Sequence, residues 1–214
     1  TDRTDILVAY EVCRALFDLE GARAAHHEAA TISEPMHSPI FTQIILPELC
    51  ADYVLGEEWT AAHAYAQQAL ATHDDTCQPG ALIRLYEIEA LVHAGALDVA
   101  AGAVARLEAV TRDNSRYRVA YLRAAGALAR ARRTDAARRE AVAYLAEAAQ
   151  LATEIGLPGE LWAIHAELAH RYEALGEAGL AHAADANRAA IVKALAAQLE
   201  SDDRDRFIQA TSHR

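Results

Sequence analysis

The chain has 214 residues, 53% of them hydrophobic, and a formal net charge of −11. This length and apolar content suffice for a sizeable core, and the acidic balance disfavours nonspecific DNA binding by the surface as a whole. No apolar run reaches the roughly 18 residues that a membrane span needs, and no signal peptide opens the chain. We therefore predict a cytoplasmic protein that does not enter a membrane.

Much of the apolar fraction is alanine, the strongest helix former, whereas glycine (10) and proline (5) are few. Apolar residues recur at three- and four-residue steps along most of the chain, which predicts helices in pairs. The turns between paired helices fall near Gly21, Gly56, Gly95 and Gly176, and at a site without glycine, residues 132–134. We expect antiparallel hairpins over residues 5–33, 39–74, 80–111, 116–155 and 159–199, and a C-terminal helix over residues 202–210.

Local signals refine two of these hairpins. The run Asp113-Asn114-Ser115 is a cap cluster for the fourth hairpin, and Thr134 or Asp135 is expected to cap its second helix. Pro47 lies inside the second hairpin, where it predicts either a kink in a continuous helix or a short helix that begins at Pro47.

The three cysteines, Cys13, Cys50 and Cys77, show no CxxC spacing. An odd number of widely separated cysteines is typical of reduced thiols in a cytoplasmic protein. Cys13 and Cys50 lie at matching places in the first two hairpins, so we predict that both are small buried packing residues.

The last hairpin carries Leu168-Ala169, Tyr172, Gly176 and Ala181 at a spacing that resembles the tetratricopeptide repeat, a helix-turn-helix of about 34 residues. This resemblance implies a right-handed superhelical solenoid of about five hairpins, forming one domain over residues 1–214. Further along, the runs 189–199 and 202–207 resemble the ends of helical-repeat regions in large bacterial signal-transduction ATPases and transcriptional regulators. That resemblance implies a sensing or interaction region, with ATPase or DNA-binding modules outside this chain.

In tetratricopeptide arrays, the first helix of each hairpin lines a concave groove that holds peptides. The resemblance therefore implies a set of groove-facing positions in this chain: Tyr10, Arg14, Phe17, Val54, Leu85, Glu89, Leu122, His170 and Glu173. An apolar helix face does not reveal whether it meets solvent or another helix, so core packing is an equal alternative for several of these positions.

Residues 112–139 hold nine arginines against only Asp113 and Asp135, in a chain that is acidic overall. Arg116, Arg123 and Arg130 are seven residues apart and share one helical stripe, which Arg133 extends at the next turn. The stripe is either a solvated face paired with neighbouring acids or a site for an acidic protein segment. Nucleic acid is the less favoured partner because the flanking regions are acidic.

Motifs that carry catalysis are missing: there is no GxxxxGK[ST], GxSxG or HExxH, and the only lysine, Lys193, lies within a helical pattern. Glu167 and His170 have the spacing of a di-iron carboxylate motif, but no second copy accompanies them. We therefore predict a noncatalytic scaffold for protein or peptide recognition, without metal or cofactor, and leave homodimer formation open. The alternatives are a helical enzyme or metal-binding protein with a site between helices, or an anion- or nucleic-acid-binding module that uses the arginine cluster.

Overall fold

The computed structural model describes residues 18–33, 39–71 and 81–212, which are 87% helical and contain no strand. The prediction of an all-α chain is confirmed over these residues. No helix among them is long and apolar enough to cross a membrane. Close contacts divide the chain into two compact units, Thr1–Val110 and Thr111–Arg214.

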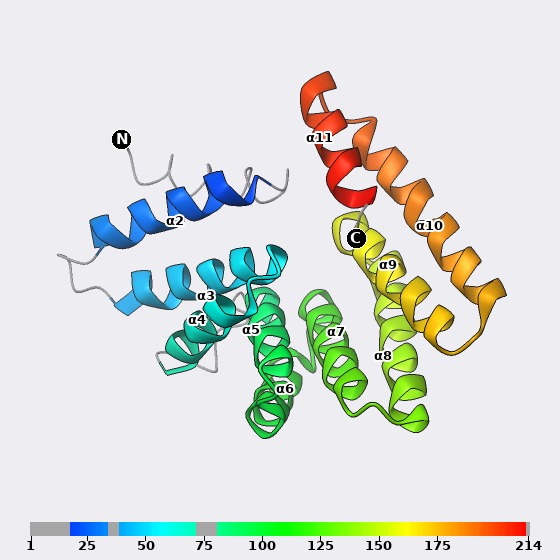
Figure 1. Cartoon of the computed structure of the whole chain (residues 1–214), viewed down its shortest axis with the longest axis horizontal. Helices are drawn as coiled ribbons and strands as arrows, with labels where there is room; N and C mark the ends of the chain where they lie inside the picture. The colour runs from blue at the N-terminus through cyan, green and yellow to red at the C-terminus, as the bar shows by residue number, and fades with distance from the viewer. Residues whose placement is uncertain (1–17, 34–38, 72–80, 213–214) are drawn as a thin grey trace. The chain divides into compact units, whose positions relative to one another are not determined.

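In Figure 1 the helices of the first unit, α2 to α6, are coloured from blue to green in chain order. Within it, α3 packs against α2, α4 and α5, and α4 also contacts α5. The bounds of its helices are α2 Leu19–Ser33, α3 Pro39–Leu55, α4 Trp59–Ala71, α5 Ala81–His93 and α6 Leu97–Thr111.

The second unit consists of two helix hairpins and a further helix. Two closely packed pairs, α7 with α8 and α9 with α10, are joined by contacts between α8 and α9, and α11 lies on α10 (Figure 1). The bounds are α7 Ser115–Ala131, α8 Asp135–Glu154, α9 Pro158–Ala174, α10 Ala178–Ala196 and α11 Ser201–Ser212. Helices α7, α9 and α11 begin 43 residues apart, and so do α8 and α10.

The helix ends of the second unit follow the predicted cap and turn residues. The Asn114 side chain accepts hydrogen bonds from the backbone N–H groups of Arg116 and Tyr117, and Thr134 accepts one from Ala137. Gly156 and Gly176 end α8 and α9 with φ angles of 73° and 77°, the left-handed region that glycine adopts without strain. The glycine-free turn instead places Arg133 at φ 57°.

Helix α3 continues through Pro47, so the alternative of a short helix beginning at Pro47 is wrong. A buried cluster formed by Cys50, Val54, Ala62, Ala66 and Ala90 joins α3 to α4 and α5. Burial raises the pKa of the Cys50 thiol, and Glu87 and Glu89 raise it further, which is expected for an inert packing residue. The predicted burial of Cys50 is confirmed, whereas Cys13 and Cys77 lie outside the described residues.

Where both ends of a predicted hairpin are described, the observed helices agree with it to within three residues, and the C-terminal helix begins one residue earlier and ends two residues later than predicted. The parts of the predicted hairpins at residues 5–17, 72–74 and 80 lie outside the described residues. The superhelical arrangement and the single domain over residues 1–214 stay predictions.

Candidate recognition surface on α7 and α9

Helix α7 combines an almost continuous buried core, from Val119 to Ala129, with a stripe of arginines. Arg116, Arg123 and Arg130 are all half-buried rather than extended into solvent. They lie on one side of α7 because they are seven residues apart, which is close to two helical turns. The stripe therefore lies beside packed structure, where its charges are less well solvated than on an open surface.

The first arginine of the stripe is neutralised by the neighbouring hairpin. Arg116 Nη1 lies 2.5 Å from Glu160 Oε1 near the start of α9, with the two side chains 38% and 24% exposed. The chain runs down α7, back along the antiparallel α8 and down α9, so α7 and α9 run in the same direction (Figure 1). The ion pair thus joins the first turns of two parallel helices and marks one end of a face that both contribute to.

The other end of this face is cationic. Burial lowers the pKa of Arg171 on α9, Glu167 raises that pKa again, and the positive charge of Arg130 lowers it. Arg130 and Arg171 are therefore close enough for their like charges to repel. The Nε atoms of Arg123, Arg130 and Arg171 are all buried and have no hydrogen-bond acceptor within the part of the chain that the structure describes.

We define the α7–α9 cationic face by six residues: Arg116, Arg123, Arg130, Arg171, Glu160 and Glu167. Four positive charges against two negative ones leave it with a net charge of +2. A buried guanidinium donor without an acceptor costs about 1–3 kcal/mol, because the water that solvated it has been removed and nothing replaces it. A bound anion would supply the missing acceptors, and guanidinium groups suit carboxylate and phosphate oxygens.

Arg118 is half-buried over the Tyr121 ring, and the arginines at the turn into α8 are solvated. Arg132 pairs with Glu140 and Arg138 pairs with Asp135, each at 3.3 Å and in exposed positions. Arg133 is exposed in the turn between α7 and α8. The solvated alternative thus describes Arg132, Arg133 and Arg138, whereas a site for an acidic segment at the other arginines stays a prediction.

The described positions implied for a peptide groove differ in their exposure to solvent. Val54, Leu85 and Leu122 are buried, which favours the core alternative at these three positions. His170 and Glu173 are exposed on α9, and Glu89 is half-buried on α5. The remaining three predicted positions lie outside the described residues: Tyr10, Arg14 and Phe17.

Sequence reasoning missed the contribution of α9 to the cationic face. Arg171 and Glu160 lie far along the chain from the arginine cluster, so composition could not associate them with it. One signal was present: Glu160 and Glu167 have the same seven-residue spacing as Arg116 and Arg123. Matching spacings of opposite charge on two parallel helices can indicate facing stripes.

The described residues contain no group of three or more histidine, cysteine, aspartate or glutamate side chains placed to hold a metal ion. Comparison with known proteins gives no matching family model, no matching curated sequence and no matching solved structure. The function of the chain must therefore be inferred from the geometry of its own residues.

Proposed function

We propose that this chain is a noncatalytic recognition module that binds an acidic segment of a protein partner on the α7–α9 cationic face. The observation that carries the proposal is the set of three buried Nε donors, on Arg123, Arg130 and Arg171, for which the described residues provide no acceptor. A carboxylate-bearing segment would supply these acceptors and relieve the repulsion between Arg130 and Arg171.

The positions of Glu160 and Glu167 indicate where on the face the acidic residues of such a partner would lie. Glu160 already neutralises Arg116 at the start of the face, whereas the far end, at Arg130 and Arg171, has an excess of positive charge. The partner is thus expected to place its acidic residues near the C-terminal ends of α7 and α9. Protein is favoured over nucleic acid because a long phosphate backbone would also approach the acidic remainder of a chain of charge −11.

The proposed mechanism is differential binding, in which the partner stabilises the arrangement of α7 and α9 that brings their arginines together. The resemblance of the last third of the chain to bacterial regulators is the reason to search for the partner among signalling proteins. It also suggests cytoplasmic modules, such as an ATPase or a DNA-binding domain, as the recipients of the change.

The test is binding of a fluorescein-labelled oligoglutamate peptide, measured by anisotropy, with oligolysine and single-stranded DNA as comparison probes. The double variant Arg123→Glu with Arg130→Glu is expected to weaken oligoglutamate binding at least about tenfold, since each charge-assisted hydrogen bond contributes about 1.5–3 kcal/mol. Raised salt should weaken the complex of the unmodified protein.

The matched control is Arg138→Glu with Arg139→Glu, which makes the same change in charge on the exposed side of α8. If this control weakens binding as much as the α7 variant does, net charge alone explains the effect and the proposed site is wrong. Tighter binding of DNA than of oligoglutamate would identify a nucleic-acid module instead.

A further inference from the structure

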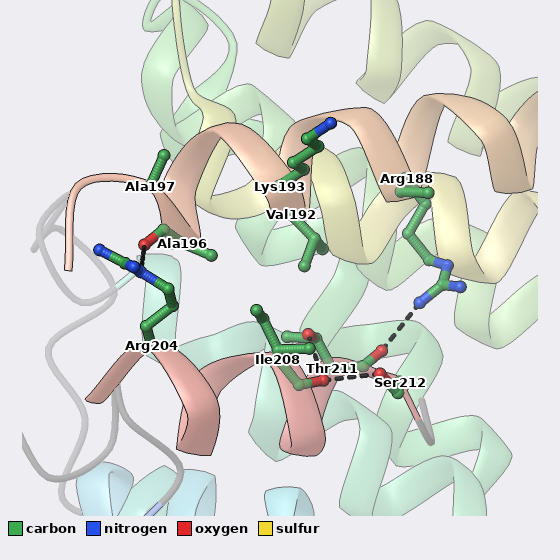
Figure 2. A pocket seen from close by; sticks show the side chains of 10 residues that line it. Arg188, Val192, Lys193, Ala196, Ala197, Arg204, Ile208, Thr211 and Ser212 are labelled. Carbon is green, nitrogen blue, oxygen red and sulfur yellow. Dashed lines mark hydrogen bonds between the residues drawn. The ribbon is translucent and has the colours of Figure 1, made fainter. Parts of the chain in front are cut away.

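Helices α10 and α11 form an open groove of about 570 Å³ on a different part of the second unit (Figure 2). Its floor is apolar, and Val192 and Ile208 point toward each other across it. Among the described residues, three cations and no acid line it. The complete lining is Arg188, Ala189, Val192, Lys193, Ala196, Ala197, Arg204, Ile208, Thr211 and Ser212.

Contacts at both ends hold α11 beside α10. At one end, Arg188 Nη1 donates to the carbonyl oxygen of Thr211 at 2.8 Å, and at the other Arg204 Nε donates to the carbonyl oxygen of Ala196 at 3.1 Å. Phe207 is buried and meets the Trp162 ring edge-on, with 6.4 Å between the ring centroids. The groove is therefore a feature of a docked helix and does not result from a detached one.

The 43-residue spacing of α7, α9 and α11 shows which face of α11 lines this groove. Phe207 corresponds to the buried Ile164 of α9, and Thr211 corresponds to the buried Leu168. Two further positions correspond on all three helices: Leu122, His165 and Ile208 in the first set, and Gly126, Ala169 and Ser212 in the second.

On α7, this face is covered by the antiparallel helix α8. A Cβ atom added to Gly126 would lie 3.4 Å from Leu145 Cγ and 3.5 Å from the carbonyl oxygen of Ala141, so the two helices approach closely there. On α9 the equivalent positions are less exposed than on α11: Ala169 is only 7% exposed and His165 is half-buried.

On α11 the same face is open. Ile208 is 41% exposed, whereas its equivalent on α7, Leu122, is fully buried. Ser212 is exposed, whereas Ala169 is buried. Within the ranges that the structure describes, no helix covers α11 as α8 covers α7. The α10–α11 groove thus has a small residue, Ser212, at the close-approach position and an apolar floor, as a packing site for a helix would. Among the described residues, no helix fills it.

We propose that the α10–α11 groove binds an amphipathic helix of a partner protein, antiparallel to α11, in the place that α8 occupies on α7. Arg188 is already paired with Asp185, so it is Lys193 and Arg204 that indicate acidic residues along the flanks of that helix. Its apolar face would carry small residues opposite Ser212, as α8 carries Ala141 opposite Gly126. This is helix-in-groove recognition, and it does not depend on the α7–α9 cationic face.

The chain itself supplies two suitable probes. A peptide with the sequence of α8, residues 135–154, has four acids and two arginines and so a charge of −2. A peptide with the sequence of α10, residues 178–196, has one acid and two cations and so a charge of +1. Both sequences cover an equivalent helix in this fold, so a difference between them reports mainly the charge preference of the groove.

We expect the labelled α8 peptide to bind the full chain saturably and to gain helicity on binding, and to bind more tightly than the α10 peptide. Ile208→Glu should weaken its binding at least about tenfold, because the substitution removes apolar contact and buries a charge. Lys193→Glu should abolish the preference for the α8 peptide. The matched control, Gln209→Glu, adds the same charge at an exposed position outside the groove and should leave binding unchanged.

Ile208 is exposed, so its substitution is expected to preserve the fold, which circular dichroism checks. Absence of saturable binding by both peptides would overturn the proposal, and so would binding that Ile208→Glu does not change. A dimer in light scattering that Ile208→Glu dissociates would show instead that a second copy covers the groove. The binding of oligoglutamate on α7 and α9 should be unaffected by Ile208→Glu, which separates the two surfaces.

Discussion

Glu87 on α5 offers a direct test of how the first unit is packed. Its side chain is 1% exposed, and the described residues provide no hydrogen-bond donor to either carboxylate oxygen. Burial raises the pKa of Glu87 from 4.5 to about 7, although the nearby charges of Arg84 and Arg106 lower it. The interior of the unit thus contains a carboxyl group that is much more stable when protonated.

The direction of the pH effect is set by the raised pKa. The folded state holds the Glu87 proton more tightly than the unfolded state does, so this contribution to stability is complete below about pH 4.5 and is lost as the pH rises through about 7. The change corresponds to about 3 kcal/mol, since one pKa unit is about 1.4 kcal/mol. Glu87→Gln removes the ionisation while it retains the shape of the side chain.

The assay is urea unfolding of the unmodified protein and of Glu87→Gln at several pH values between about 5 and about 9. We expect the two proteins to have similar free energies of unfolding at the acidic end. Glu87→Gln should then become progressively more stable than the unmodified protein, by up to about 3 kcal/mol above neutral pH.

The control is Glu28→Gln, which removes an exposed carboxylate from α2 and should show little such trend. A difference between Glu87→Gln and the unmodified protein that stays constant with pH would refute the reasoning. A constant difference would mean that a donor or a water molecule hydrogen-bonds to Glu87 in solution, so that its ionisation does not destabilise the fold.

Three further predictions concern single residues. Gly176→Ala should lower the free energy of unfolding, measured in urea, by about 1 kcal/mol, because Gly176 has φ 77°. No atom of the described residues lies within 4 Å of the added Cβ, so the cost comes from the backbone conformation and not from a steric clash. Cys50 should react with a thiol reagent only on unfolding, since it is fully buried and burial raises its pKa, as peptide mapping by mass spectrometry can show. Arg116→Met should change stability by only about 0–1 kcal/mol in thermal unfolding, because its ion pair with Glu160 is partly exposed.

The sequence predicts the helices well because their ends depend on local chemistry. Asn114 and Thr134 cap helices through their own side chains, and Gly176 adopts a backbone conformation that few other residues tolerate. Such features need no knowledge of distant residues. The continuity of α3 through Pro47 is different, because packing of the surrounding helix against α2, α4 and α5 decides it.

The buried polar groups could not be predicted from helical patterns. His26 and Asp52 are both almost fully buried, and His26 Nδ1 lies 2.5 Å from Asp52 Oδ2. A charged residue in a helix pattern is ordinarily assigned to the solvent side, so only the tertiary structure shows that α2 and α3 bury this pair together. The same limit applies to Leu85 and Leu122, whose apolar character suits a groove and a core equally.

The 43-residue register separates what the fold requires from what it does not. The position of Gly126 holds only small residues on α7, α9 and α11, namely Gly126, Ala169 and Ser212, as expected where an antiparallel helix approaches closely. The position of Arg123 instead holds Ala166 on α9 and Gln209 on α11, and that of Arg130 holds Glu173 on α9. Packing of the repeated hairpin therefore does not demand arginine at either place. Half-buried arginines that the architecture does not need, with buried donors that no acceptor among the described residues satisfies, support the proposal that this face binds a ligand.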